Sequence, residues 1–135
     1  MIYDHRLGDN NWRIPEVSNY LESEKLTSVL DVGGAAKVCS PLVTHVLDFE
    51  PHKLVGEFEI FAGNMELAST WDPIYAHVKA NGKFDFVICT HTLEDLNCPE
   101  QIVVRLAEVG KMGFISMPSK FAETNRHEIC YGFSG

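Results

Sequence analysis

The chain has 135 residues, of which 45% are hydrophobic and 22% charged, a balance typical of one globular domain or part of one. Its formal net charge of −8 would repel a polyanion, so nucleic acid is not expected as a partner. The first residues lack the apolar stretch of a signal peptide, and no apolar run is long enough to cross a membrane. The four cysteines are scattered without a Cys-x-x-Cys pair, which favours a cytoplasmic protein with reduced thiols.

The first predicted elements are a helix and three short strands. Ile14, Val17 and Leu21 recur at the spacing of one helical face, so a helix is predicted over residues 14–24. Apolar runs then predict strands over residues 28–32, 45–49 and 57–61. The links between these strands are too short for full crossover helices, so the first two crossovers are expected to be reduced to turns.

A helix and a buried strand come next. Asp72 is a suitable N-cap and Pro73 a suitable first helical residue, while Gly82 falls where the helix should end. Residues 84–89 are almost continuously apolar, as expected of a strand that is covered on both faces.

The last helix has the clearest limits, because Pro99 begins it and Gly110 stops it. Its expected buried stripe is Ile102, Val103, Leu106 and Val109. A strand follows over residues 113–117. The tail over residues 119–135 shows no strong period, so no element is predicted there.

This alternation of strands and connections favours an α/β fold, a three-layer sandwich around a mainly parallel sheet of about five strands. We expect a single domain over residues 1–135, with the sheet core over residues 28–118. Glycines and acidic residues follow several of the predicted strands. The carboxyl ends of parallel strands are where open α/β sheets bind their ligands. The sequence therefore predicts a ligand site at that edge.

Five segments resemble, in the same order, the motifs of class I S-adenosylmethionine-dependent methyltransferases. They are residues 29–34 (VLDVGG), 46–48 (VLD), 63–66 (GNME), 84–94 (FDFVICTHTLE) and 113–118 (GFISMP). The resemblance implies a Rossmann-like fold, S-adenosylmethionine as the cofactor, and methyl transfer to an acceptor for which a small molecule is the favoured class.

The resemblance also implies a set of cofactor-binding residues. The glycines would let the backbone approach the methionine end of the cofactor, and Asp48 would accept hydrogen bonds from the ribose hydroxyls. Asn64 would pair with the polar edge of adenine, and Thr90 would face the cofactor. The full expected set is Asp31, Gly33, Gly34, Ala35, Asp48, Phe49, Asn64, Met65, Thr90 and His91.

The chain departs from the family pattern in two ways. The glycine turn of the family commonly reads Gly-x-Gly-x-Gly, whereas residues 33–37 read GGAAK. The family fold has seven strands and only five are predicted here, which favours a truncated domain lacking the last two strands. Such a sheet would leave the apolar strand with Phe114, Ile115 and Met117 unpaired, so a homodimer through this edge is expected.

Catalytic and metal sites are weakly indicated. His91 is a weak candidate for the general base, and a role in hydrogen bonding near the cofactor without proton transfer is the favoured interpretation. His127, Glu128 and Cys130 lie close in sequence, but no metal site is expected from them. Two other functions stay open. One is a non-catalytic pseudo-methyltransferase that serves as a binding or interaction module, and the other is a different nucleotide-using α/β enzyme, against which the absence of Gly-x-Gly-x-x-Gly argues.

Overall fold

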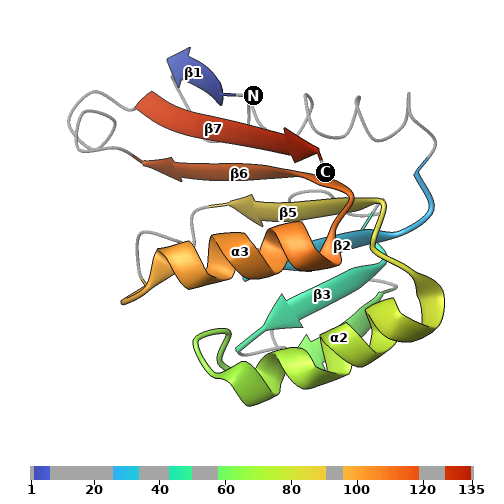
Figure 1. Ribbon diagram of the computed structural model, residues 1–135. Helices are drawn as coiled ribbons and strands as arrows, with labels where there is room; N and C mark the ends of the chain where they lie inside the picture. The colour runs from blue at the N-terminus through green and yellow to red at the C-terminus, as the bar shows by residue number, and fades with distance from the viewer. Residues whose placement is uncertain are drawn as a thin grey trace.

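The computed structural model describes residues 2–6, 26–33, 43–49, 58–90, 96–118 and 127–134. These residues form one seven-stranded sheet in the order β1-β7-β6-β5-β2-β3-β4 (Figure 1). The strands are β1 (Ile2–Arg6), β2 (Val29–Val32), β3 (His45–Asp48), β4 (Glu59–Ala62), β5 (Phe86–Thr90), β6 (Met112–Pro118) and β7 (His127–Ser134). The helices are α2 (Ala68–Asn81) and α3 (Pro99–Val109).

Strands β2 to β6 run parallel, which confirms the expected five-stranded parallel sheet. Helices α2 and α3 share one hydrophobic core with Leu30, Val87 and Ile115, so both helices cover the same face of the sheet (Figure 1). Residues that point the other way, such as Val46 and Ile88, are buried as well. Burial on both faces is what the three-layer arrangement requires, and it accounts for the continuous apolar runs of these strands.

The limits of the two helices were predicted with different success. Helix α3 begins at Pro99 and ends before Gly110, as expected, but Val103 is 40% exposed and does not belong to its buried stripe. Helix α2 ends at Gly82, where φ is 85° and the backbone N–H donates to the carbonyl of Val78. It begins at Ala68 rather than at Asp72, so Pro73 lies inside it. The Asp-Pro signal was misleading, because the turn that follows β4 starts the helix one turn earlier.

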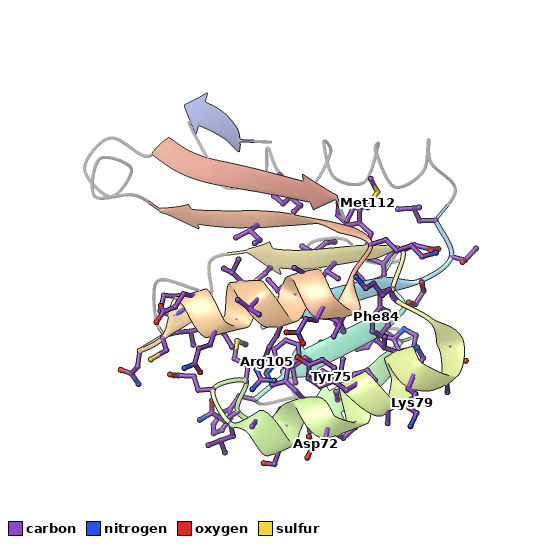
Figure 2. All side chains as sticks on the ribbon, viewed as in Figure 1. Asp72, Tyr75, Lys79, Phe84, Arg105 and Met112 are labelled. Atoms are coloured by element: carbon purple, nitrogen blue, oxygen red, sulfur yellow. The ribbon has the colours of Figure 1, made fainter. Side chains whose placement is uncertain are left out.

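A polar contact joins α2 to α3. The hydroxyl of Tyr75 on α2 donates to Glu108 Oε2 at 2.8 Å, and Arg105 Nη1 donates to the same hydroxyl at 3.3 Å. The Arg105 guanidinium also lies 5.7 Å from the ring centroid of Trp71 and 5.8 Å from that of Tyr75, within cation–π range. Figure 2 shows Arg105 and Tyr75 side by side between the two helices. Burial and the bond to Glu108 raise the pKa of Tyr75. Tyr75 therefore stays protonated at neutral pH and links α2 to α3.

The far edge of the sheet differs from the expectation. Strand β7 pairs antiparallel with β6 over its whole length, and β1 pairs antiparallel with β7. The strand with Phe114 is therefore not an open edge, and the reason for expecting a homodimer there is removed. The sheet is also larger than the five strands expected, because segments from both ends of the chain extend it.

Neither described helix has the length and apolar character needed to cross a membrane, since α2 has 14 residues and α3 has 11.

Asp85 connects three segments just before β5. Its carboxylate accepts hydrogen bonds from the backbone N–H and the hydroxyl of Thr27 at 3.1 and 3.0 Å, and Lys111 Nζ lies 3.2 Å away. The bond from the Thr27 backbone and the charge of Lys111 lower the pKa of Asp85, against a smaller opposing effect of burial.

A lowered carboxyl pKa stabilises the fold at neutral pH, and this contribution is lost as the pH falls through the folded-state value, below the ordinary 3.8. We therefore expect Asp85→Asn to lower the free energy of unfolding at pH 7 by up to about 1 kcal/mol, given the exposure of the pair. Urea unfolding at pH 7 and pH 3 measures this. The difference between wild type and variant should shrink at pH 3, and an unchanged difference would contradict the linkage.

Candidate functional site

The turns that follow β2, β3 and β4 lie together at the carboxyl edge of the parallel sheet. Gly33 follows β2, Phe49 follows β3, and Gly63 with Asn64 follows β4. Because the three strands are neighbours in the order β2-β3-β4, residues that are distant in sequence meet along one edge. This is the edge at which the sequence predicted a ligand site.

Backbone hydrogen bonds hold these turns against the end of β3. The N–H of Gly33 donates to the carbonyl of Leu47 at 2.7 Å, and the N–H of Gly63 donates to the carbonyl of Asp48 at 3.1 Å. Gly33 has φ of 65°, in the left-handed region that favours glycine. The strand end with Asp48 is thus fixed from both sides.

Asp48 and Phe49 are the accessible groups at the centre of this edge. Asp48 is half-buried, and the side chain of Phe49 is 69% exposed. Single exposed apolar residues are common on protein surfaces, so the position of Phe49 beside a carboxylate at the strand ends, rather than its exposure, makes it a candidate ligand contact. The pair offers an acceptor for hydroxyl groups and an apolar surface for a flat ring.

Asn64 shapes the turn between β4 and α2. Its side-chain Oδ1 accepts the backbone N–H of Glu66 at 2.9 Å, and its carbonyl accepts the N–H of Leu67 at 3.0 Å. The Oδ1 atom is therefore engaged in holding the turn, and Nδ2 is the amide group that would donate to a ligand. Asparagine is favoured in such turns because its side chain can bond to backbone two residues ahead.

Met65 lies in the hydrophobic core. Its side chain is only 8% exposed, and its carbonyl accepts the indole N–H of Trp71 at 2.7 Å. Met65 is one of the residues that the family resemblance implies for cofactor binding. The structure instead packs it inward, where it anchors the turn to α2.

A contact between two loops was not foreseen from the sequence. Glu66 Oε2 accepts the backbone N–H of Asn97 at 3.1 Å. It links the turn after β4 to the segment that enters α3. The two residues are 31 positions apart, so no local pattern could reveal the contact.

Of the other residues expected to bind the cofactor, the structure describes some and not others. Asp31 is fully buried in the middle of β2, where its register partners are Val46 and Ile88. Thr90 is the last residue of β5. Ile88 pairs with Asp31, and Thr90 and Gly33 each follow their strand's paired residue by two positions, so Thr90 lies beside Gly33. Gly34, Ala35 and His91 lie outside the described residues.

No family profile matches the chain, and no curated protein is similar enough in sequence to identify a relative. Solved structures do match the fold. The plantazolicin methyltransferase BpumL, in complex with a monoazolic desmethylPZN analog and SAH (S-adenosylhomocysteine), superposes with a TM-score of 0.57 at 15% identity, over 83% of this chain and 48% of BpumL. The N-terminal domain of EvdMO1 with SAH bound superposes with a TM-score of 0.53 at 16% identity, over 82% of this chain and 50% of that chain.

These matches show that the chain has the fold of class I S-adenosylmethionine-dependent methyltransferases. The resemblance seen in the sequence motifs is thereby confirmed at the level of the fold. The chain spans about half the length of the solved structures that it matches.

Proposed function

We propose that this chain binds S-adenosylmethionine at the carboxyl edge of β2, β3 and β4 and supports methyl transfer to a small molecule. The observation that supports this most directly is the fixed position of Asp48 between two bonded glycine turns. The methyltransferases with the same fold have been solved with SAH bound. One of them also holds a small-molecule substrate analogue.

The side chains at this edge fit the chemistry of such a cofactor. The carboxylate of Asp48 would accept hydrogen bonds from two neighbouring ribose hydroxyls. The exposed ring of Phe49 would stack on adenine, and Nδ2 of Asn64 would donate to a ring nitrogen. The formal charge of −8 also favours approach of a positively charged sulfonium.

When bound, S-adenosylmethionine supplies an electrophilic methyl group that passes in line to the acceptor and leaves S-adenosylhomocysteine. The residues of the chain orient the cofactor and keep its ribose and adenine in place, so that the acceptor meets the methyl group at the required angle. His91 follows β5 in sequence and is retained as a candidate for removing a proton from the acceptor.

Calorimetric titration with S-adenosylhomocysteine tests the proposal. Asp48→Ala removes two charge-assisted hydrogen bonds, so we expect binding to weaken by about 2–4 kcal/mol, or roughly 30- to 1,000-fold in Kd. Asp72→Ala is the matched control, because Asp72 is exposed on α2 and points away from the sheet (Figure 2). Its Kd should equal that of the wild type.

The result also separates the proposed function from its alternatives. Binding that Asp48→Ala leaves unchanged would exclude the site proposed here. Binding without methyl transfer to any tested acceptor would favour the non-catalytic pseudo-methyltransferase. Binding of a nicotinamide cofactor in place of S-adenosylhomocysteine would favour another nucleotide-using enzyme.

A further inference from the structure

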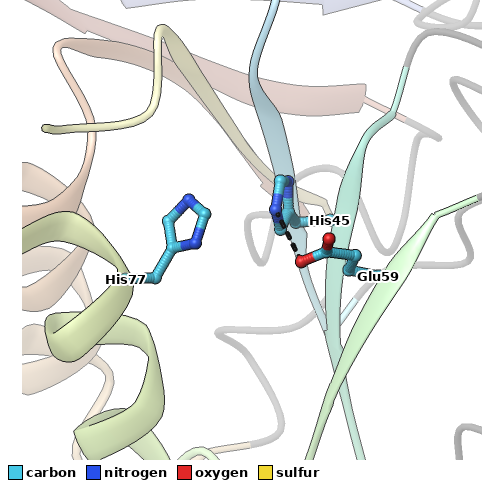
Figure 3. A group of neighbouring side chains, drawn as sticks. All are labelled: His45, Glu59 and His77. Atoms are coloured by element: carbon cyan, nitrogen blue, oxygen red, sulfur yellow. Dashed lines mark ion pairs between the residues drawn. The ribbon is translucent and has the colours of Figure 1, made fainter. Parts of the chain in front are cut away.

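A second group of polar side chains lies at the amino end of the parallel strands, opposite to the edge described above. His45 is the first residue of β3 and Glu59 the first residue of β4. The two are register partners in the parallel pair, so their side chains leave the same face of the sheet. His77 projects toward them from α2, which covers that face (Figure 3). Three elements thus bring two imidazoles and a carboxylate together.

The three side chains are close enough to share one ion. Each can present one ligand atom so that all three atoms lie within 4.8 Å of one another. His45 Nε2 and Glu59 Oε2 are already 3.2 Å apart. A tetrahedral Zn²⁺ with bonds of about 2.0–2.1 Å holds neighbouring ligands about 3.3–3.5 Å apart. His45 and Glu59 are therefore already at about the required spacing, and His77 would have to move closer by up to about 1.5 Å to become the third ligand.

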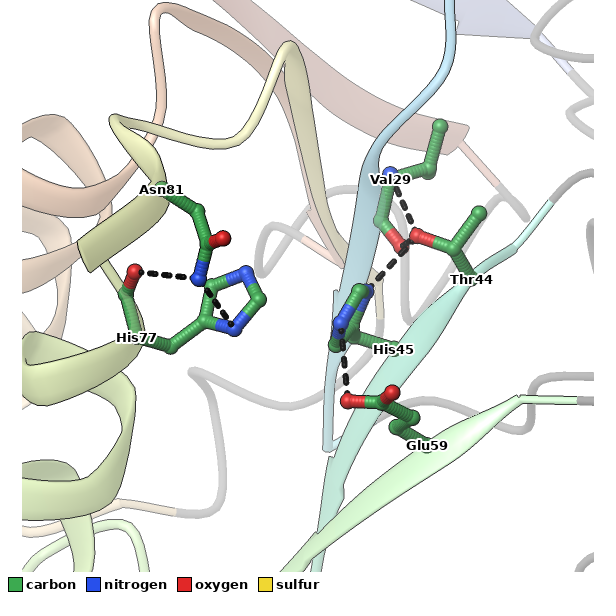
Figure 4. Close-up of polar contacts among 6 residues, drawn as sticks. All are labelled: Val29, Thr44, His45, Glu59, His77 and Asn81. Atoms are coloured by element: carbon green, nitrogen blue, oxygen red, sulfur yellow. Dashed lines mark hydrogen bonds and ion pairs between the residues drawn. The ribbon is translucent and has the colours of Figure 1, made fainter.

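Thr44 holds the ring of His45 in the orientation that a metal ligand needs. Its hydroxyl lies 2.8 Å from His45 Nδ1 and 3.1 Å from the carbonyl of Val29, and it accepts the Val29 N–H at 2.9 Å (Figure 4). When the hydroxyl donates to the Val29 carbonyl, its oxygen can accept a hydrogen bond from the Nδ1–H of His45. The lone pair of Nε2 then faces Glu59. Histidine ligands usually donate their second N–H to such an oxygen, which fixes the tautomer.

The ring of His45 is buried beside a second imidazole, which disfavours positive charge on His45. The ring centroids of His45 and His77 are 4.7 Å apart, and Phe84 stacks on His77 at 4.9 Å. The side chain of His45 is only 12% exposed. Burial and the nearby His77 lower the pKa of His45, against a smaller opposing effect of Glu59. Neutral imidazoles can bind a metal, whereas protonated ones cannot.

The ring of His77 is held only weakly by hydrogen bonding. The amide of Asn81 donates to the His77 carbonyl at 3.0 Å but lies 3.4 Å from Nδ1, which is too long to hold the ring firmly (Figure 4). Glu59 is 76% exposed in its side chain and opens the group to solvent. An ion can therefore enter without unfolding of the core.

We infer that His45, Glu59 and His77 form a binding site for a divalent transition metal of the Zn²⁺ type, with a water molecule completing the coordination. Two imidazoles and one carboxylate are a donor set that zinc accepts, and imidazole favours zinc over magnesium or calcium. The ion would join α2 to the β3–β4 edge of the sheet. This site is independent of the cofactor edge. No metal was expected from the sequence, because the three ligands lie far apart in it.

Calorimetric titration with Zn²⁺ alone tests this inference, with the exposed Cys98 replaced by serine in every protein to remove a competing thiol. The informative variants are Glu59→Gln, which keeps size and removes the charge, and His77→Phe, which keeps a ring on Phe84. Glu100→Gln, an exposed glutamate on α3, is the matched control for the first. Because Glu59 is exposed, its variant is expected to fold, and circular dichroism checks this.

We expect one Zn²⁺ per chain, and a thermal midpoint that rises with Zn²⁺ in the wild type. Glu59→Gln and His77→Phe should each weaken binding by more than the roughly 10–100-fold that is usual for loss of an outer-shell partner. Glu100→Gln should bind like the wild type. A folded wild type that does not bind Zn²⁺, or binding that the two variants leave unchanged, would overturn the inference.

Discussion

Replacing Trp71 with alanine is expected to lower the free energy of unfolding by about 3–5 kcal/mol, the range for removal of a fully buried aromatic side chain. Trp71 is 0% exposed and belongs to the core that α2 shares with the sheet. Its indole N–H also donates to the carbonyl of Met65. Domains of this size have about 5–15 kcal/mol of stability, so the loss would be a large share of the total. Urea unfolding followed by circular dichroism measures the loss.

Trp71→Phe is the variant that separates packing from the hydrogen bond. It retains most of the apolar volume and leaves the Met65 carbonyl without its indole donor, which costs about 1–3 kcal/mol. Because that bond anchors the turn after β4, the phenylalanine variant should also bind S-adenosylhomocysteine more weakly. A loss in Trp71→Ala below 1.5 kcal/mol, the typical cost of a mild core change, would show that the packing around Trp71 is looser than described.

The substitution Gly63→Ala is expected to damage both the fold and the cofactor edge. Gly63 has φ of 147°, and an added Cβ would lie 2.7 Å from Thr70 Oγ1 and 2.9 Å from Thr70 Cγ2. Backbone strain of this kind costs about 1–3 kcal/mol, and the overlap with Thr70 adds a similar amount. The turn must shift to relieve it, which moves Asn64 and weakens the bond from Gly63 to Asp48. We expect unfolding at lower urea and binding of S-adenosylhomocysteine reduced by more than about tenfold.

Gly82→Ala provides the control, since Gly82 also has a positive φ, of 85°, but no atom lies within 4 Å of its added Cβ. It should lower stability through backbone strain and leave cofactor binding unchanged. Thr70→Ala in the Gly63→Ala background should restore part of the stability, because two of the overlapping atoms are removed. Normal cofactor binding by a destabilised Gly63→Ala protein would mean that the Asn64 turn takes no part in the site.

The sequence could predict the parallel sheet because its strands are buried on both faces and therefore read as continuous apolar runs. Helix α3 could be predicted equally well from the sequence, since Pro99 and Gly110 mark its two ends. The start of α2 could not be predicted, because the packing of Trp71 and the Asn64 turn outweigh the Asp-Pro signal at residues 72 and 73. Local propensity is a weak guide where tertiary contacts decide.

The same distinction holds for the sites. The position of Asp48 at the carboxyl edge follows from strand order, which a pattern of strands and turns can indicate. Burial of Met65 depends on α2 folding back over the turn, and the group of His45, Glu59 and His77 depends on strand register and helix placement together. Neither leaves a local signature. Side chains that meet through tertiary structure are visible only once the fold is known.

The pairing of β1 with β7 has a consequence for the order of folding. Ile2 pairs with Tyr131, so the outermost strand closes a loop that contains nearly the whole chain. Contacts of such high sequence separation form late, because closing the long loop between them lowers the chain entropy before any stabilising contact has formed. During synthesis, the first residues leave the ribosome long before their partner strand is made. We therefore expect β1 to dock last, onto a sheet that has already formed, and a nascent chain arrested before residue 127 to show the parallel core without it.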